Sequence, residues 1–380
     1  MNLKVLLVLS FGHLVTDIYQ GALPALLPFL KTRLSLSYAL AGAILMAATF
    51  ASSIMQPVFG YFSDKREKVL LLPLGCLAAG VGLSLLSAPN RYGFVLMLVM
   101  ISGLGVAAYH PEGYKTAHYF TGKNLATGMS VFSVGGNLGF ALGPMIAITI
   151  VTQLGFEVLP VMVIFSLLFL ALFRFQWTAI QRAHRERPQA REEAAAAGRN
   201  AYLPLFLTIA TVVTRSWTQM GLMTFIPFYY IDYLKGDPMY SGKLVSTFLL
   251  GGVAGTIIGS ILADRFGHKP FLVCSLVAAS VLTPLILAVR GPWLFVVLAV
   301  VGMALISSFT VTIVMAQRLL PRNLGIASGL MVGFAIGVGG LGVTLLGVVA
   351  DSFGIPMALK AIMILPVIGL GLSLAIRYPR

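Results

Sequence analysis

Ionisable side chains inside apolar segments are the groups of this chain that can do chemistry. His13 and Asp17 are four positions apart, so on a helix they share one face. His110 and Glu112 flank Pro111, whose missing N–H opens the hydrogen bonding of a helix at that point. Acidic and imidazole groups within a bilayer must face protein or water, and they are the usual members of proton relays. We predict that these four side chains bind and release protons, with Asp17 or Glu112 as the carrier.

Other interpretations of the same side chains stay open. His13 can serve only to hold Asp17 in place, and Glu112 can form an internal ion pair with Lys115. The four groups can also converge as nitrogen and oxygen ligands of a divalent metal ion. However, the sequence lacks the spacing typical of a helical zinc site, which is two histidines at i and i+4 with a glutamate between them. We therefore expect no resident metal and no cofactor.

The second half of the chain offers a fixed cation instead of titrating groups. Arg215 lies near the middle of an apolar segment, and arginine stays protonated in proteins. Hydroxyl and aromatic side chains accompany it in that half. This asymmetry predicts that the first half carries protons while the second half binds the substrate. The predicted substrate contacts are Arg215, Trp217, Tyr109, Asn137, Thr310 and Phe309.

The segments that carry these residues must lie in a membrane. The 380 residues are 58% hydrophobic and 10% charged, with a mean hydropathy of +0.93. This composition excludes a soluble globular protein. Since about 20 apolar residues span a bilayer, the length accommodates twelve spans and no sizeable soluble domain. The apolar runs predict helices at 3–30, 38–62, 69–88, 93–119, 125–150, 157–175, 203–231, 241–263, 270–289, 293–317, 324–350 and 355–376.

The order of these helices is six, a polar break, and six more. We predict an N-terminal bundle at 1–175, a cytoplasmic linker at 176–200 and a C-terminal bundle at 201–380. Part of the linker can form a helix on the membrane surface. Eighteen of the 26 lysines and arginines fall on one side of the membrane and six on the other. The positive-inside rule then predicts that both termini are cytoplasmic. The same rule accounts for the net charge of +14 without a nucleic-acid partner.

An internal repeat relates the two halves at an offset of about 200 residues. Asp64 falls on Asp264, and each follows a small residue and precedes a basic one in a short loop. A carboxylate at such a helix end can lie against the positive N-terminus of a neighbouring helix. We predict that the two loops form conformational latches. Their residues are Gly60, Asp64, Lys65, Arg66, Asp264, Arg265 and Lys269.

The paired loops resemble the signature loop of the major facilitator superfamily, and the resemblance covers essentially the whole chain. A finer resemblance is to the fosmidomycin-resistance branch of that superfamily. It is carried by His13-x-x-x-Asp17, by Tyr109-His110-Pro111-Glu112 and by Val134-Gly135-Gly136-Asn137-x-Gly139. The resemblance implies an all-α membrane fold of two six-helix bundles related by a pseudo-two-fold axis. It also implies proton-driven export of drugs by alternating access.

The fifth predicted helix also resembles the antiporter motif of drug exporters in this superfamily. Ser130 and Ala147 replace two of its usual glycines, and both are still small enough for close helix approach. Packing against a neighbouring helix explains such glycines equally well. The predicted packing residues are Gly135, Gly136, Gly139, Gly143 and Pro144.

Together these features predict a transporter and not an enzyme. We expect a proton-coupled antiporter, acting as a monomer in a bacterial plasma or inner membrane, that exports small amphipathic or anionic compounds, including antibiotics. The same fold also imports solutes, so a nutrient or organic-acid symporter is the first alternative. A divalent-metal transporter is the second.

Overall fold

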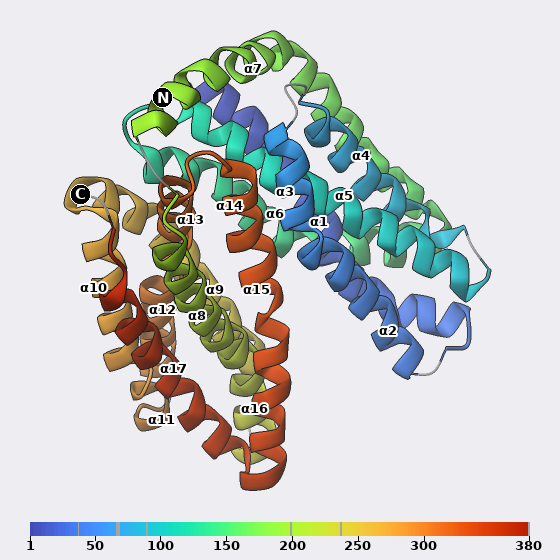
Figure 1. The fold of residues 1–380 in the computed structure, drawn as a ribbon. Coiled ribbons are helices and arrows are strands. Elements are labelled where there is room, and N and C mark those ends of the chain that lie inside the picture. The colour runs from blue at the N-terminus through green and yellow to red at the C-terminus, as the bar shows by residue number, and fades with distance from the viewer. Residues whose placement is uncertain (37, 66–68, 89, 198–199, 236–237, 379–380) are drawn as a thin grey trace. The chain divides into compact units, whose positions relative to one another are not determined.

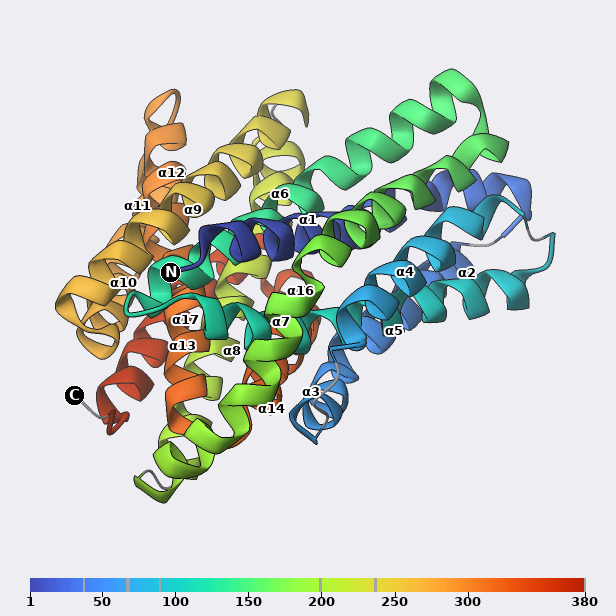
Figure 2. The same ribbon diagram turned by 90° about the horizontal axis from the view of Figure 1, so that it is seen from above.

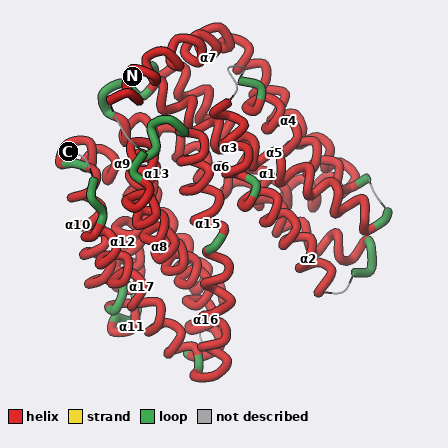
Figure 3. The backbone as a smooth tube through the Cα atoms, viewed as in Figure 1, coloured by secondary structure: helices red, strands yellow, loops and turns green. Residues whose placement is uncertain are grey.

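The computed structural model describes the chain except residues 37, 66–68, 89, 198–199, 236–237 and 379–380. Side chains at 38–39, 187–197, 232, 238–239 and 336 are also outside the described set. The described backbone is almost entirely helical, with short loops between the helices (Figure 3).

The described elements before residue 200 include four long helices, α1, α5, α6 and α7. In order they are α1 (Leu3–Arg33), α2 (Tyr38–Thr49), η1 (Phe50–Ile54), α3 (Gln56–Lys65), α4 (Leu71–Ser84), η2 (Leu85–Ser87), α5 (Tyr92–Phe120), α6 (Leu125–Leu154), η3 (Phe156–Met162) and α7 (Val163–Ala197).

The elements after residue 200 are interrupted more often. In order they are α8 (Tyr202–Phe228), η4 (Tyr229–Tyr233), α9 (Pro238–Phe266), α10 (His268–Leu282), α11 (Leu285–Ala288), α12 (Trp293–Ile306), α13 (Ser308–Leu319), α14 (Leu324–Gly329), η5 (Leu330–Phe334), α15 (Ala335–Gly337), α16 (Gly339–Phe353) and α17 (Ile355–Ala375).

These elements form twelve helical runs in the described residues, as the apolar segments predict. Ten of the runs are long and apolar enough to cross a membrane. The other two are the shorter α4 run and α8, which is rich in threonine and carries Arg215. Three runs contain a π-helical segment, η1, η4 or η5, that the hydrophobic pattern does not predict. Such segments depend on local packing and are often found at functional sites.

The chain divides into two compact units, which Figures 1 and 2 show from two directions. Unit 1 comprises Met1–Arg199 together with Pro321–Phe334, and unit 2 comprises Asn200–Leu320 together with Ala335–Arg380. In unit 1, α1 packs along α6, α4 along α5, and α14 against α3. In unit 2, α9 packs along α12 and α8 along α17.

Glycines of α6 allow its backbone to approach that of α1 closely. A Cβ atom at any of three of these positions would overlap a backbone carbonyl oxygen of α1. Only glycine therefore permits this crossing without movement of one helix. The contacts are Gly135 with Ser10, Gly139 with Leu14, and Gly143 with Ile18; Pro144 follows and is half-buried.

Candidate functional site

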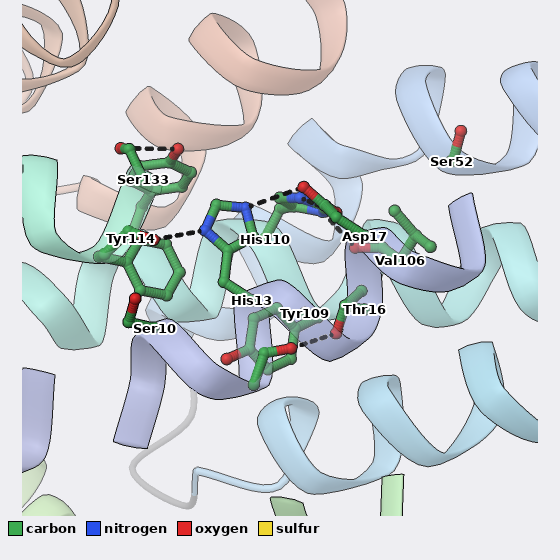
Figure 4. A network of polar contacts seen from close by, with 12 residues as sticks. Ser10, His13, Thr16, Asp17, Ser52, Val106, Tyr109, His110, Tyr114 and Ser133 are labelled. Carbon is green, nitrogen blue, oxygen red and sulfur yellow. Dashed lines mark hydrogen bonds and ion pairs between the residues drawn. The ribbon is translucent and has the colours of Figure 1, made fainter. Parts of the chain in front are cut away.

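The buried cluster of His13, Asp17 and His110 lies where α1 meets α5 in unit 1. Nε2 of His110 is 3.1 Å from Oδ1 of Asp17, and Nε2 of His13 is 3.4 Å from Oδ2. Figure 4 shows the carboxylate of Asp17 directed toward the two imidazoles. Asp17 is 9% exposed, and both histidines are more deeply buried. The structure thus brings together three of the four residues predicted to handle protons.

Hydrogen bonds to backbone carbonyls determine which imidazole nitrogen faces Asp17. Nδ1 of His13 lies 2.9 Å from the carbonyl oxygen of Phe132, and Nδ1 of His110 lies 2.9 Å from that of Val106. A carbonyl oxygen only accepts, so each Nδ1 must donate. In the neutral imidazoles, both Nε2 atoms then present lone pairs to a carboxylate that also only accepts. A stable arrangement of these three groups therefore requires at least one additional proton, or another cation, between the carboxylate and the imidazoles.

Aromatic side chains and one glycine enclose the cluster. The ring of His13 stacks on Phe132 at 4.3 Å between centroids and meets Tyr114 edge-on at 5.6 Å. A Cβ atom at Gly136 would overlap Nε2 of His13 and lie 2.7 Å from Oδ2 of Asp17. Gly136 therefore does more than allow helix packing, because its missing side chain leaves the space that the cluster occupies.

Tyr109, a predicted substrate contact, belongs to this enclosure. It is fully buried, and its hydroxyl donates to the carbonyl oxygen of Leu9 at 2.8 Å. Its ring lies 6.3 Å from those of both His13 and His110. Asn137, also a predicted substrate contact, is half-buried on α6 immediately after Gly136.

Glu112 belongs to a second buried cluster. Its Oε1 lies 3.7 Å from Nε2 of His184 on α7, and the same nitrogen lies 3.0 Å from the hydroxyl of Thr116. Lys115, the ion-pair partner considered for Glu112, donates to the carbonyl and hydroxyl oxygens of Ser63. All five side chains are buried. Glu112 and Lys115 are therefore held in a polar network between α3, α5 and α7.

Unit 2 contains the predicted cation. Arg215 on α8 is 3% exposed, and its guanidinium carbon lies 5.3 Å from the centroid of the Phe309 ring. Trp217 is half-buried and donates from Nε1 to the carbonyl oxygen of Val338 at 3.0 Å. Thr310 is fully buried on α13. Of the predicted substrate contacts, Arg215 and Phe309 are in direct contact.

The first predicted latch residue, Asp64, binds the N-terminus of α14. Its two carboxylate oxygens accept hydrogen bonds from the backbone N–H groups of Gly325 and Ile326, each at 3.0 Å. A carboxylate is favoured there because the first N–H groups of a helix point outward unpaired. A Cβ atom at Gly60 would overlap the carbonyl oxygen of Gly325, so α3 and α14 meet backbone to backbone.

The remaining latch residues make separate contacts. Lys65 lies over the ring of Tyr61 at 4.3 Å, and Arg66 lies outside the described residues. In unit 2, Oδ1 of Asp264 lies 3.6 Å from Nε2 of His268. The other two latch cations contact unit 2 as follows: Arg265 lies over the ring of Phe266 at 5.2 Å, and Lys269 donates to the carbonyl oxygen of Leu374 at 3.0 Å.

His184 is the main residue of these clusters that the sequence analysis misses. It lies in the segment predicted to be a linker, through which α7 continues as far as Ala197. A signal was present in the sequence: Phe169, Phe173, Ile180 and His184 recur at spacings of four, seven and four residues, and all are buried. That pattern is typical of one buried helix face.

Comparisons with known proteins identify the class that this fold and these clusters define. The sequence pattern described as Major Facilitator Superfamily matches residues 9–242 and 213–380. The chain therefore belongs to the major facilitator superfamily, and it is a multi-pass membrane transporter.

Two curated relatives cover nearly the whole chain. The uncharacterized MFS-type transporter YfnC of Bacillus subtilis strain 168 is 33% identical over 96% of this chain and 91% of its own length. The fosmidomycin resistance protein of Escherichia coli strain K12 is 30% identical over 95% of this chain and 90% of its own length. Among solved structures, the E. coli fucose:proton symporter aligns with a TM-score of 0.72 at 14% identity, covering 98% of each chain. That likeness supports the fold.

Proposed function

We propose that this transporter is a proton-coupled antiporter that exports small amphipathic or anionic compounds by alternating access. It works as a monomer in a bacterial plasma or inner membrane, with both termini in the cytoplasm. The similarity to a fosmidomycin resistance protein supports export. The excess of basic residues on one side of the predicted membrane topology supports the orientation.

The observation that carries the proposal is the position of Asp17 between two imidazole Nε2 atoms. Because both Nδ1 atoms donate to backbone carbonyls, a proton arriving at the cluster gains a hydrogen bond to the carboxylate. Loss of that proton leaves only acceptors facing one another. Proton binding therefore changes the stability of the cluster. If the cluster is more stable in one conformation of the transporter than in the other, proton binding shifts the equilibrium between the inward-open and outward-open conformations.

Exchange follows if proton binding and substrate binding exclude each other. The form loaded with substrate reorients toward the outside, releases its substrate and takes up a proton. The protonated form then returns inward. In this scheme Asp17 carries the proton. Glu112 and His184 form a second polar cluster, and Asp64 at the N-terminus of α14 acts as a latch.

Asp17→Asn tests the carrier role. In inside-out vesicles with an acidic interior, the wild type should accumulate a substrate as protons leave, whereas Asp17→Asn should lose this gradient-driven accumulation by at least about tenfold. Protein amount and elution as a single folded species should be unchanged. Undiminished driven accumulation in the variant would remove Asp17 from the carrier role. If the opposite pH gradient drives accumulation, the protein is a symporter and not an antiporter.

One observation favours the divalent-metal alternative. One ligand atom from each of His13, Asp17 and His110 lies within 4.8 Å of the others, and two imidazoles with a carboxylate suit a zinc-class ion. Calorimetric titration of tag-free protein with Zn²⁺ separates the two functions. Stoichiometric binding together with Zn²⁺ uptake into proteoliposomes would favour the metal transporter, whereas proton exchange in the presence of EDTA would favour the antiporter.

A further inference from the structure

Arg215 has two buried hydrogen-bond donors without a partner among the residues that the structure describes. Its Nε and Nη1 atoms are inaccessible to solvent and have no hydrogen-bond partner among the residues that the structure describes. The side chain as a whole is 97% buried, as its 3% exposure implies. Native proteins pair nearly all buried donors, so two unmade bonds on one buried cation point to a missing partner.

No acidic side chain that the structure describes in the second half of the chain supplies that partner. The acidic residues between 201 and 380 whose side chains the structure describes are Asp264 and Asp351, which lie near the C-terminal ends of α9 and α16. Arg215 lies thirteen residues from either end of α8 (Tyr202–Phe228). At 1.5 Å per residue, this distance is about 20 Å along the helix. No carboxylate of the described residues lies within ion-pair distance of Arg215.

Burial of an unpaired cation is strongly unfavourable, and arginine cannot relieve it by losing a proton. Phe309 offsets only part of the cost through its contact with the guanidinium group. Because the ring contacts the face of the guanidinium, the N–H groups of Nε and Nη1, which lie in its plane, can still donate to a ligand. Planar guanidinium groups of this kind recognise carboxylates, phosphates and phosphonates through charge-assisted hydrogen bonds.

We infer that Arg215 binds the anionic group of the transported compound. The substrate class is thereby narrowed to compounds with a carboxylate, phosphate or phosphonate group, and Phe309 is the aromatic contact beside that group. This inference rests on the proposed transport function and specifies its substrate. Protons bind at the cluster in unit 1, whereas the anion binds in unit 2, so the two sites can be tested by separate variants.

Equilibrium binding to the purified full-length protein, without a pH gradient, tests the inference. Two matched pairs of probes are used: fosmidomycin, a phosphonate, with its uncharged dialkyl ester, and benzoate with benzamide. Isothermal titration calorimetry should show that at least one acid binds 30-fold or more tightly than its uncharged counterpart, because a buried charge pair is lost in the neutral compound. Equal binding of acid and counterpart in both pairs would overturn the inference.

Variants at position 215 assign the preference to the guanidinium group. Arg215→Gln should bind acid and neutral compound equally, and Arg215→Lys should keep a reduced preference because it retains the charge. Arg290→Gln removes an exposed arginine from the same unit and should leave the preference intact. If Arg215→Gln keeps the wild-type preference, or if Arg290→Gln loses it equally, the assignment to Arg215 is wrong.

Further measurements distinguish binding of the transported anion from binding of other anions, and distinguish the anion site from the proton site. Inorganic phosphate and vesicles containing phosphatidylglycerol should not displace the bound acid at equal concentration, and displacement by either would assign the site to a free ion or a lipid headgroup. Asp17→Asn should keep the preference for the acid even though it loses driven exchange. Failure of the proton mechanism would therefore appear in transport, and failure of the anion site in binding.

Discussion

At the scale of single residues, the geometry of the cluster of His13, Asp17 and His110 depends on the absence of a side chain at one position. Gly136 faces Nε2 of His13 and Oδ2 of Asp17, and a Cβ atom there would overlap the first of these atoms. The backbone of α6 can therefore approach α1 at the level of the cluster. It also delivers the carbonyl oxygen of Phe132, which accepts from His13.

Gly136→Ala should disturb the cluster without changing any ionisable group. The added methyl group must displace the imidazole or the carboxylate, and overpacking of this kind costs about 1–3 kcal/mol. We expect proton-driven accumulation in inside-out vesicles to fall at least about tenfold, together with a lower unfolding temperature. Gly42→Ala is the control, because a Cβ atom there meets nothing within 4 Å. Equal behaviour of the two variants would contradict this role for Gly136.

Sequence spacing predicts some contacts of the cluster and not others. His13 and Asp17 are four residues apart on one helix, so their contact follows from helical geometry. The contact of His110 with Asp17 depends on where α5 crosses α1, which no local pattern encodes. For the same reason, Glu112 is predicted from the sequence to act together with His13, Asp17 and His110, whereas in the structure it lies beside His184.

At the scale of elements, the apolar runs predict where helices lie but not where α7 ends. Its last part has many charged residues, which favour a linker on composition alone. The helix nevertheless extends into this charged segment. Its buried face continues as far as His184, and a helix is stabilised mainly by the packing of such a face against the rest of the protein. The π-helical segments were likewise not predictable. A π-helical turn contains an extra residue, and whether that residue fits depends on the surrounding helices and not on the local sequence.

His184→Gln tests whether the contacts of His184 stabilise the packing of α7 against α5. His184 is buried, lies 3.0 Å from the hydroxyl of Thr116 and meets the ring of Tyr119 edge-on at 5.0 Å. Loss of these contacts should destabilise the protein by about 1–3 kcal/mol. The unfolding temperature of the purified protein should therefore fall. Arg185→Gln changes the next, exposed residue and should have little effect. An equal or smaller effect of His184→Gln would mean that this contact contributes no stability.

At the scale of the whole molecule, the sequence repeat predicts two equivalent latches, and the structure gives them different contacts. Asp64 accepts from two N–H groups of α14, and residues 321–334 belong to the same compact unit as Asp64. Asp264 lies beside His268, at the start of the next helix along the chain. Both carboxylates lie in the last turn of a helix, Asp64 in α3 and Asp264 in α9. The repeat cannot predict their partners, because these depend on which helices are in contact in a given state.

The proposed orientation in the membrane can be tested at the two ends of α5. Arg91 precedes this helix and Lys123 follows it, and both side chains are exposed. The positive-inside rule places Arg91 outside and Lys123 in the cytoplasm. With Cys76 and Cys274 replaced by alanine, a membrane-impermeant maleimide should label Arg91→Cys in intact cells. It should label Lys123→Cys only after the cells are opened. The reverse pattern would invert the topology, and the proton gradient would then drive the proposed cycle in the direction of import.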